Sequence, residues 1–436
     1  MAADVIPAPA SGLLQRAGRA WARQSGGVEV DLAVVGAGGA GLSLLTQLDR
    51  LVTAGQGAPG GGGSRRVPSV ALIDPVHRRA DDRTWCFWDD GHNDVEQAVH
   101  RAWSKVELVD ALGRSQLLDL GSMRYVMVRS KDFYALADDA AARLGAVRIP
   151  APADQVGDGL VLAGGLKVRA TWVFDSRPAP PLRPANTALL QHFRGWSVRF
   201  ARDMFDPELP ILMDFSVPQP GRGVAFGYLL PSSPRRALVE YTEFSPARLT
   251  GAAYDAALHA YLHRRFGAAP NDYVIDHVED GAIPMTDAVH ARRVDAATFR
   301  LGTAGGATRG STGYTFAAMQ RQGAAVAAAV LAGREPMPPA AYPPRHRWMD
   351  AVMLRALDRG LVGGPELFAA LFRHNPPQRV LRFLDGRSSR REELALMATA
   401  PTVPMLRASL GDAAARARRR RTPAPAAAPA RAPLSS

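Results

Sequence analysis

The sequence has very little cysteine and no long apolar run. Cys86 is the single cysteine among 436 residues, so an intrachain disulfide or a metal site built from several cysteines cannot form. We expect no bound metal, and the composition suits a reducing compartment. No apolar stretch reaches the roughly 18 residues that cross a bilayer, and no secretory signal pattern opens the chain. The sequence therefore predicts a cytoplasmic protein.

Lysine is also scarce, and arginine supplies most of the positive charge. Lysine occurs only at positions 105, 131 and 167, although the net charge is +12. Alanine, glycine and proline are abundant, a bias typical of GC-rich coding. Part of the charge is concentrated in five arginines of residues 416–421. The charge alone would permit nucleic-acid binding. Because no nucleic-acid motif accompanies it, we expect no such partner.

A glycine-rich turn follows the first apolar run. Residues 31–36 suit a buried parallel strand, and residues 40–52 suit a helix. Between them lies the pattern G-x-G-x-x-G, formed by Gly36, Gly38 and Gly41. The first glycine permits a tight turn, the second lets the backbone approach a pyrophosphate, and the third lets helix and strand pack closely. The helix N-terminus then attracts phosphates. This pattern predicts a Rossmann-type βαβ unit that binds a dinucleotide.

Asp74 ends the next predicted strand, residues 70–74, where a carboxylate would accept hydrogen bonds from ribose hydroxyls. It lies further along the chain than the usual separation of about 20 residues. A glycine-rich insertion at residues 52–66 accounts for the difference. Asp74 is therefore the predicted ribose ligand.

A second glycine-rich segment favours FAD over NAD. Gly302, Gly305 and Gly306 follow a predicted strand near residue 300. In two-domain flavoproteins a late strand–turn–helix closes over the flavin, whereas a single dehydrogenase domain needs no such segment. An unrelated glycine turn is the alternative interpretation.

The order of segments predicts an α/β fold, with a Rossmann-like FAD-binding domain, an inserted antiparallel β-sheet substrate domain and a C-terminal helical region. Strand-like runs separated by Pro and Gly between residues 190 and 245 indicate the inserted sheet. The predicted parts are an irregular arm (1–29), the first part of the FAD-binding domain (30–184), the substrate domain (185–284), the returning FAD-binding segment (285–344), a helical region that contacts substrate or membrane (345–410), and a disordered basic tail (411–436).

Several segments together resemble the FAD-dependent lycopene cyclase family, in particular the bacterial type of lycopene β-cyclase. They run in family order over roughly residues 30–405. The matching stretches are DLAVVGAGGAGLSL, RTWCFWDD (83–90), VFDSRP (173–178), HFRGWSVRF (192–200), FDPELPILMDF (205–215), ALVEYTEFS (237–245), EDGAIPM (279–285), GTAGGATRGSTGYTF (302–316) and RVLRFLDG (379–386).

The resemblance implies an isomerase, of the intramolecular lyase class, that closes the linear ψ ends of lycopene into β-ionone rings. The products would be γ-carotene and then β-carotene, without net redox change. Reduced FAD, with NADPH as its electron source, would stabilise a cationic transition state. Lycopene and other ψ-end carotenoids would be the substrates. The alternative is an FAD-dependent monooxygenase or isoprenoid reductase of the same fold, which would consume NADPH with each product.

Glu240 is the candidate catalytic acid. Period-two alternation in the predicted strand puts it on one sheet face with Leu238 and Phe244. A carboxyl group in apolar surroundings has a raised pKa and can hold a proton at neutral pH, as a general acid must. Plant members of the family carry two adjacent glutamates here, whereas Tyr241 follows Glu240. The alternative is a structural glutamate on an edge strand, paired with Arg235 or Arg236.

Other residues allow two interpretations each. Glu279 in EDGAIPM lies either near the flavin or at the cap of a turn. Asp175 and Arg177 are expected to pair at the end of a strand. Cys86 is expected to be a buried, small apolar residue.

The C-terminal region is a candidate membrane contact, because lycopene partitions into bilayers. Residues 345–385 interleave Arg with Leu, Phe and Met, which suits either the lipid interface or a packed helical subdomain. The arginines of residues 416–421 would add attraction to anionic lipids. We expect a cytoplasmic protein that is peripheral on the inner face of the membrane.

Overall fold

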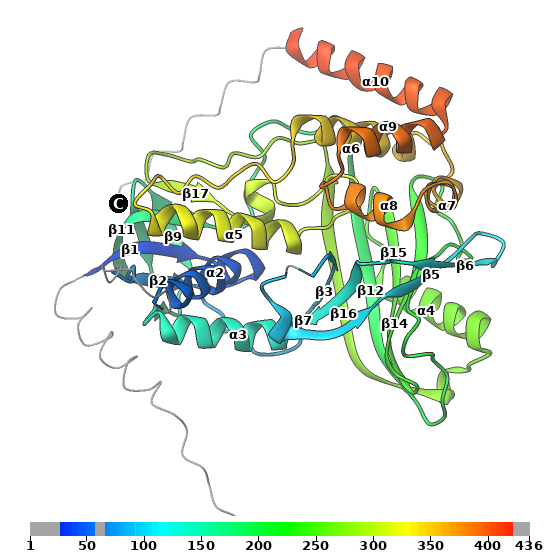
Figure 1. The fold of residues 1–436 in the computed structure, drawn as a ribbon, viewed down its shortest axis with the longest axis horizontal. Coiled ribbons are helices and arrows are strands. Elements are labelled where there is room, and N and C mark those ends of the chain that lie inside the picture. Colours follow the sequence, from blue (N-terminus) through cyan, green and yellow to red (C-terminus); the bar gives the residue numbers. More distant parts are fainter. Residues whose placement is uncertain (1–26, 57–65, 92, 422–436) are drawn as a thin grey trace, which may run out of the picture.

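The computed structural model describes residues 27–56, 66–91 and 93–421, and its two large sheets lie side by side (Figure 1). One sheet, with its helices α2, α3 and α5, contains the predicted dinucleotide unit. The other carries the long strands β12, β14, β15 and β16. This arrangement confirms the predicted α/β plan of a Rossmann-like domain with a second, sheet-based part. Residues 57–65 of the glycine-rich insertion lie outside the described residues.

The first sheet has the strand order β8-β2-β1-β11-β10-β9, and β17 also pairs with β11. The pairs β1–β2, β1–β11, β2–β8 and β11–β17 are parallel. Leu32 and Val34 face α2, α3 and α5, whereas Ala33 and Val35 pack toward the β9–β10 hairpin. Both faces are covered, which explains the continuous apolar run of β1. The bounds are β1 Gly27–Val35, β2 Val70–Ile73, β8 Val147–Ile149, β9 Ala153–Gly157, β10 Leu160–Ala163, β11 Leu166–Asp175, β17 Thr298–Arg300, α2 Gly39–Gln56, α3 Ser130–Arg143 and α5 Phe316–Leu331.

The second sheet has the order β16-β12-β15-β14-β13-β5-β6. Neighbouring strands are antiparallel except for the pair β13–β5. Helix α4 covers one face, where Tyr254 and Leu258 pack on Val239. The other face meets helices α6 to α8 and a small sheet, β3-β7-β4. The bounds are β3 Thr84–Asp89, β4 Val99–Trp103, β5 Lys105–Val109, β6 Ser115–Asp119, β7 Arg124–Arg129, β12 Ala188–Phe200, β13 Ile211–Asp214, β14 Val224–Ser233, β15 Arg236–Ser245, β16 Tyr273–Thr286 and α4 Gly251–Phe266.

Residues 105–119 lie in the second sheet, although the prediction assigned them to the first part of the FAD-binding domain. Strands β5 and β6 belong to the second sheet, although they precede residue 185. Glu107 N donates a hydrogen bond to Pro210 O at 2.8 Å, and Leu108 is buried in the same cluster as Leu212. Backbone pairing with a distant strand therefore puts the β5–β6 hairpin in the second sheet. The local sequence of the hairpin does not indicate this position.

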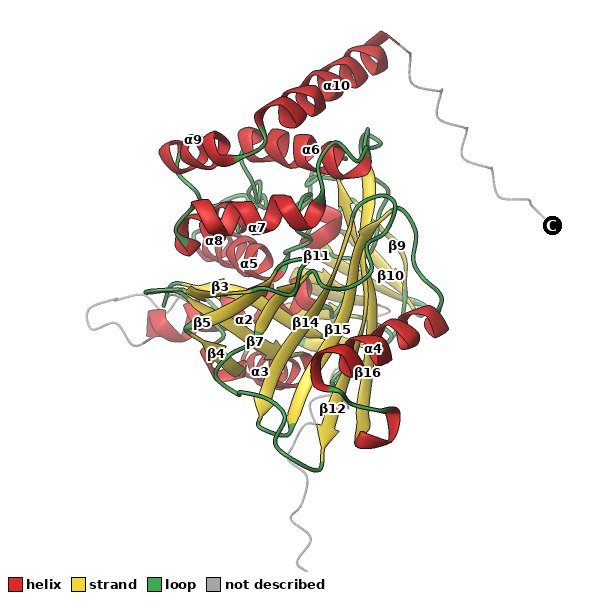
Figure 2. Cartoon of the chain, turned by 90° about the vertical axis from the view of Figure 1, so that its right-hand side faces the viewer, coloured by secondary structure: helices red, strands yellow, loops and turns green. Residues whose placement is uncertain are grey.

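Helices fill the C-terminal region, as predicted, and form the outer layer of this end of the molecule (Figure 2). The predicted disordered tail is wrong for residues 411–421, because α10 continues to Arg421. A buried Asp412 accepts from Arg416 at 2.6 Å, and Ala408 packs against Val352 and Ala356. Residues 422–436 lie outside the described part. The bounds are α6 Pro344–Asp358, α7 Gly364–His374, α8 Pro377–Leu384, α9 Arg390–Thr399 and α10 Thr402–Arg421.

The N-terminal arm predicted for residues 1–29 falls mainly outside the described residues, and its last three residues already belong to β1. Among the helices of the described chain, none combines the length and the apolar character needed to cross a membrane.

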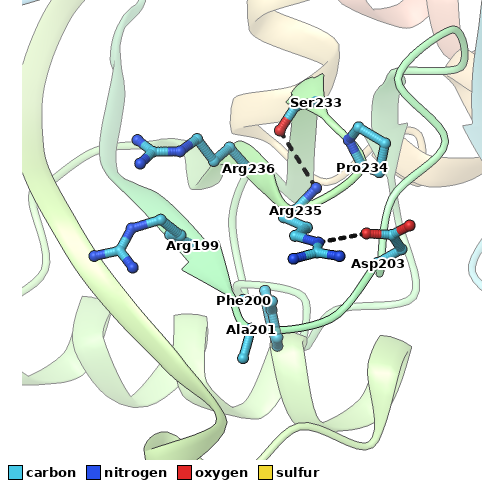
Figure 3. Close-up of a pocket in the computed structure, with 8 residues that line it drawn as sticks. All are labelled: Arg199, Phe200, Ala201, Asp203, Ser233, Pro234, Arg235 and Arg236. Carbon is cyan, nitrogen blue, oxygen red and sulfur yellow. Dashed lines mark hydrogen bonds and ion pairs between the residues drawn. The ribbon is translucent and has the colours of Figure 1, made fainter.

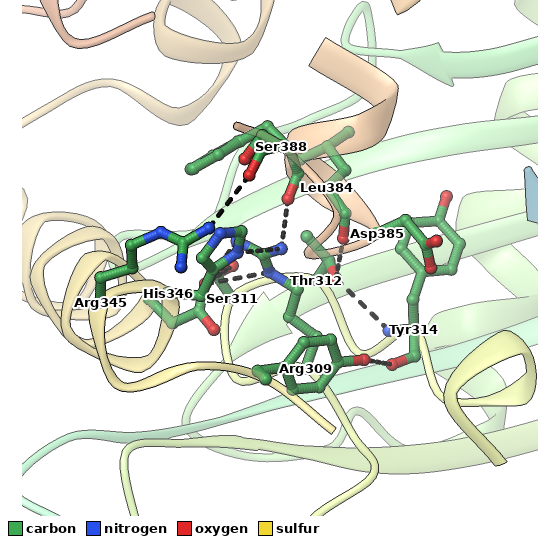
Figure 4. Close-up of polar contacts among 12 residues, drawn as sticks. Arg309, Ser311, Thr312, Tyr314, Arg345, His346, Leu384, Asp385 and Ser388 are labelled. Carbon is green, nitrogen blue, oxygen red and sulfur yellow. Dashed lines mark hydrogen bonds and ion pairs between the residues drawn. The ribbon is translucent and has the colours of Figure 1, made fainter. Parts of the chain in front are cut away.

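A buried polar network joins the C-terminal helices to the loop that precedes α5 (Figure 4). Arg309 is fully buried, and its Nε donates to Asp350 Oδ1 at 3.1 Å. Ser311 Oγ donates to the same oxygen at 2.7 Å. His346 Nε2 lies 2.7 Å from Glu393 Oε1. A buried charge needs such partners, so the network fixes the loop that leads to Tyr314.

Candidate active site

The first glycine turn has the geometry that a dinucleotide requires. Gly36 has φ +97°, and a Cβ on Gly41 would lie 2.1 Å from Gly36 O. Both positions therefore exclude a side chain. Gly38 differs, because a Cβ there would meet nothing within 4 Å. The space beside Gly38, at the N-terminus of α2, is thus open to a ligand.

Asp74 lies at this turn, as predicted, and also holds it in place. Its Oδ2 accepts a hydrogen bond from Ala37 N at 2.7 Å and pairs with Arg78 at 3.2 Å. A small pocket lies beside it at the carboxyl ends of β1, β2 and β8, where open α/β sheets bind ligands. Its lining residues are Ala37, Leu72, Asp74, Val76, His77, Arg148, Ile149 and Pro150. The sequence did not indicate Arg78 or Arg148, which no motif marks.

The second glycine segment meets the first. Gly302 has φ +63°, and a Cβ there would lie 2.6 Å from Ala40 Cβ of α2. A Cβ on Gly305 would lie 2.3 Å from Arg300 O, and Gly306 has φ +78°. The second glycine segment therefore lies against the N-terminal end of α2, beside the first glycine turn.

Two polar atoms beside this segment are buried and have no hydrogen-bond partner among the described residues. They are His290 Nδ1 and Arg300 Nε, and His290 Cβ lies near Gly306. Buried polar groups are normally satisfied, so these two atoms beside the second glycine segment are exceptions.

Glu240 lies in the interior of the second sheet, on β15 between β12 and β14. It faces the apolar cluster that contains Leu238 and Phe244, as the alternation predicts. Thr242 Oγ1 donates a hydrogen bond to Glu240 Oε1 at 2.5 Å.

The alternative of a structural ion pair for Glu240 is wrong. Arg235 pairs with Asp203 at 2.6 Å, and Arg236 pairs with Asp276 at 3.2 Å. Both arginines line a surface pocket at the β14–β15 turn (Figure 3). Because carboxylates already neutralise them, we assign this pocket no part in the candidate site.

A row of residues across four strands places a second carboxyl group near Glu240. Gly195 of β12 pairs with Glu240 on one side and with Glu279 of β16 on the other, and Tyr228 of β14 pairs with Glu240. Residues in one row point to the same face of a sheet. Because Gly195 has no side chain, a gap in the row separates the two carboxyl groups. A glycine inside a predicted strand can indicate such a close approach.

Thr84 joins the small sheet to this row. Its Oγ1 donates a hydrogen bond to Glu279 Oε2 at 3.1 Å. Glu279 therefore lies within a strand with its side chain directed to the site, and the turn-capping interpretation is wrong. The predicted pair of Asp175 and Arg177 forms at 2.9 Å, away from this row.

Burial sets the protonation of both carboxyl groups. Desolvation, and next the charge of Glu279, raise the pKa of Glu240 to about 8, against the hydrogen bond from Thr242. Desolvation raises the pKa of Glu279 to about 7, and the hydrogen bond from Thr84 opposes it. At neutral pH Glu240 therefore holds a proton while Glu279 is partly ionised. A proton donor and a potential acceptor lie on one apolar surface.

Aromatic side chains surround the carboxyl groups. Tyr125 and Tyr228 share a hydrogen bond between their hydroxyl groups, and Trp88 lies 4.4 Å from Tyr125 between ring centroids. Burial raises the pKa of Tyr125, Tyr228 and Tyr314, so all three stay neutral. Tyr314 lies in the stretch at residues 302–316 that carries the family resemblance, whereas no motif indicates Tyr125 or Tyr228, and the three come from separate segments.

Cys86, predicted to be a buried, small apolar residue, packs against the same cluster and is half-buried. Burial raises the pKa of its thiol. Within residues 27–56, 66–91 and 93–421, no group of three or more His, Cys, Asp or Glu side chains could hold a metal ion.

The raised pKa of Glu240 should make the free energy of unfolding depend on pH. In the unfolded chain the carboxyl group titrates near its ordinary value of 4.5, and in the folded protein near 8. The folded protein binds this proton more tightly than the unfolded chain does. The resulting contribution to the free energy of unfolding is therefore complete below about pH 4.5 and is lost as the pH rises to about 8. Between pH 5 and pH 8, wild type should lose stability relative to Glu240→Gln, by up to about 1.4 kcal/mol per pH unit. Urea unfolding at several pH values would measure this, and parallel curves for the two proteins would contradict it.

The sequence has relatives among carotenoid enzymes. A family model described as lycopene cyclase protein matches residues 31–410. The chain is 37% identical over 108 residues to a lycopene beta-cyclase of Paracoccus sp. (strain N81106 / MBIC 01143). That stretch covers 24% of this chain and 27% of the relative, so the pairwise alignment spans only about a quarter of either protein.

Several solved structures share the fold of this chain. A geranylgeranyl bacteriochlorophyll reductase-like protein of Thermoplasma acidophilum has a TM-score of 0.60 at 12% identity, covering 87% of this chain and 98% of that one. The flavin-dependent brominase Bmp2 has a TM-score of 0.57 at 16% identity, covering 91% and 100%. The p-nitrophenol 4-monooxygenase of Pseudomonas putida has a TM-score of 0.53 at 12% identity, covering 89% and 98%. At such identities the likeness shows the fold alone.

Proposed function

The chain belongs to the lycopene cyclase family, and from that membership we propose that it converts the linear ψ end groups of lycopene into β-ionone rings, giving γ-carotene and then β-carotene. The observation that carries the proposal is Glu240, a protonated carboxyl group on an apolar sheet face. Such a group can protonate an alkene, which water-exposed carboxylates cannot do at neutral pH. The enzyme would be an isomerase of the intramolecular lyase class.

Glu240 begins the proposed reaction by giving its proton to the terminal double bond of the substrate. The neighbouring double bond then attacks the resulting cation, and a six-membered ring closes. Loss of a ring proton forms the β double bond. The aromatic rings of Trp88, Tyr125 and Tyr228 would line the path of the polyene and keep water from the cation, because the hydroxyl groups of Tyr125 and Tyr228 are neutral and hydrogen-bonded to each other.

FAD is the cofactor that we propose for the two glycine segments. The residues that would hold it are Gly36, Gly38, Gly41, Asp74, Gly302, Gly305 and Gly306. When bound in reduced form, with NADPH as the electron source, the flavin would supply negative charge near the cation. The open space at Gly38 and the unsatisfied atoms of His290 and Arg300 support a ligand along this path.

The stoichiometry of reductant tests the proposed function. Purified protein would be incubated with lycopene, FAD and a catalytic amount of NADPH, without oxygen. We expect γ-carotene and β-carotene in large excess over the NADPH consumed. An isoprenoid reductase would instead consume NADPH with each product, and a parallel incubation with oxygen would show the same proportionality for an FAD-dependent monooxygenase. Either result would overturn the cyclase proposal. Chromatography of pigments from lycopene-accumulating cells provides the second measurement.

We also propose that α9 and α10 rest on the cytoplasmic leaflet of the membrane that supplies lycopene. The apolar side chains of residues 345–385 mostly pack inside the protein, which favours the packed interpretation for that stretch. The outermost helices of this end are α9 and α10 (Figure 2). They carry exposed apolar side chains. These are Leu394, Met397, Val403, Leu406 and Leu410, with exposed fractions of 42–65%. Arginines next to them suit anionic lipid.

Vesicle binding tests this contact. Leu406→Glu/Leu410→Glu should weaken sedimentation with anionic vesicles about a hundredfold or more, because each of the two leucines leaves the lipid at a cost of about 1.5–3 kcal/mol when fully buried. Leu112→Glu/Leu182→Glu is the matched control, since these leucines are 76% and 66% exposed but lie elsewhere. Equal binding by both double variants would contradict the placement of the contact on α10.

A further inference from the structure

Gly195 leaves a gap in the row between Glu240 and Glu279. A Cβ at this position would lie 3.3 Å from Glu279 Cγ, 3.6 Å from Glu279 Oε1 and 3.1 Å from Leu238 Cδ1. Any side chain would therefore press against Glu279 and Leu238 within this gap. Glycine weakens the interior of a strand, and here its absence of a side chain leaves room for the side chain of Glu279 on the same sheet face as Glu240.

Building on the proposed cyclase function, we propose that Glu279 is the base that removes the ring proton, on the opposite side of the Gly195 gap from the acid. Glu240 and Glu279 would then serve the first and last steps of one reaction. The position of Glu279 relative to the ring would select which neighbouring carbon loses its proton, and thus where the double bond forms.

The proposed steps balance without an added reactant. The O–H bond of Glu240 breaks, a C–H bond forms at the terminal alkene, and Glu240 becomes a carboxylate. A C–C bond closes the ring and leaves the positive charge on a ring carbon. The adjacent C–H bond breaks, its electron pair becomes the ring double bond, and the proton passes to the carboxylate of Glu279. Proton return from Glu279 to Glu240 across the gap restores the enzyme, and substrate and product remain isomers.

Glu279 is the carboxyl group beside Glu240 that can accept the ring proton, because the other titratable groups near it are neutral or lie on the opposite sheet face. The tyrosines that face the cluster and the Cys86 thiol have raised pKa values and are neutral. Glu243 and Asp280 are neighbours in sequence on the same strands, but alternation puts them on the other face. There Glu243 accepts from Tyr241 at 3.0 Å, and Asp280 pairs with Arg248.

The resting charge distribution also fits these roles. Desolvation raises the pKa of both carboxyl groups, and the charge of Glu279 raises that of Glu240 further, so an ionised Glu279 favours a protonated Glu240. Thr84 donates to Glu279 and favours its ionised form. The charged groups that act on Glu279 from the start of β3 are Asp81, Asp82 and Arg83, while Cys86 faces both carboxyl groups.

Deuterium incorporation distinguishes a base from a structural residue. Reduced, flavin-loaded Glu279→Gln would be incubated with lycopene in D2O. We expect ring formation to fall at least about a hundredfold, while recovered lycopene gains deuterium, because protonation by Glu240 and its reversal continue. Glu240→Gln should give neither rings nor label. Asp280→Asn is the matched control on the same strand and should behave as wild type.

Each alternative result has a clear meaning. Near-normal ring formation by Glu279→Gln would overturn the assignment, and so would unlabelled lycopene without rings, which would indicate a positioning role. Flavin content and circular dichroism report folding. Should Glu279→Gln not fold, Glu279→Asp keeps a shorter base, and slow ring formation together with labelled lycopene supports the proposal, whereas unlabelled lycopene overturns it. A wild-type protein that forms no rings would instead refute the underlying cyclase function.

Discussion

Glu240→Gln is expected to abolish ring formation and to leave FAD bound. Glutamine fills the same space beside Thr242 but cannot deliver a proton to an alkene. General acids contribute about 10²–10⁴-fold to rates, and because protonation creates the reactive cation, we expect a loss at the upper end of this range. Product formation from lycopene, measured by chromatography with the reduced enzyme, gives the rate, and the flavin absorbance gives the cofactor content.

Glu243→Gln provides the matched control for this result. Glu243 is a buried glutamate of the same strand, 6% exposed, whose side chain lies on the opposite face near Tyr241. Its replacement should leave the rate of ring formation within a few-fold of wild type. Urea unfolding measures any change in the stability of this variant. If Glu240→Gln retained near-normal activity, the catalytic acid would have to be another residue.

Gly38→Val should remove FAD without unfolding the protein. A Cβ at residue 38 meets no protein atom within 4 Å, so the chain accommodates the side chain. The added atoms then occupy the space where the pyrophosphate would approach the backbone. We expect FAD affinity to fall about a hundredfold or more, equivalent to about 3 kcal/mol. Fluorescence titration with FAD measures the affinity, and thermal unfolding without FAD should match that of the wild-type apoprotein.

Variants at two other glycines of the same helix–turn unit distinguish an effect on FAD affinity from an effect on stability. Gly41→Ala places a Cβ 2.1 Å from Gly36 O, so it should lower the stability of the apoprotein as well as FAD binding. Gly55→Ala, near the end of α2, meets nothing within 4 Å and should change neither. Normal FAD binding by Gly38→Val would show that the cofactor lies elsewhere.

Short-range patterns predicted the parts of the fold that depend on local physics. The glycine spacing at residues 36–41 identifies the turn, because only certain backbone conformations fit a strand, a tight turn and a helix in succession. The alternation in β15 correctly predicts the face of Glu240. Both results follow from the geometry of a single segment.

Long-range pairing accounts for what the sequence did not predict. The gap between Glu240 and Glu279 depends on the register of β12 with both neighbours, and register is a property of three distant segments. Tyr125 and Tyr228 likewise meet only through the packing of the small sheet on the large one. The order of residues 411–421 depends on α6, against which Ala408 packs, so composition alone suggested a disordered tail.

The pairing of β17 with β11 also determines how the chain can fold during synthesis. Residues 173–175 of β11 pair with residues 298–300, so the ribosome must complete the whole intervening sheet before this edge is covered. Until then the carboxyl end of a buried strand offers free backbone groups to other chains, a known route to aggregation. Contacts so distant in sequence also slow folding. The glycine segment at residues 302–306 emerges later still, so the proposed cofactor site is complete only late in synthesis.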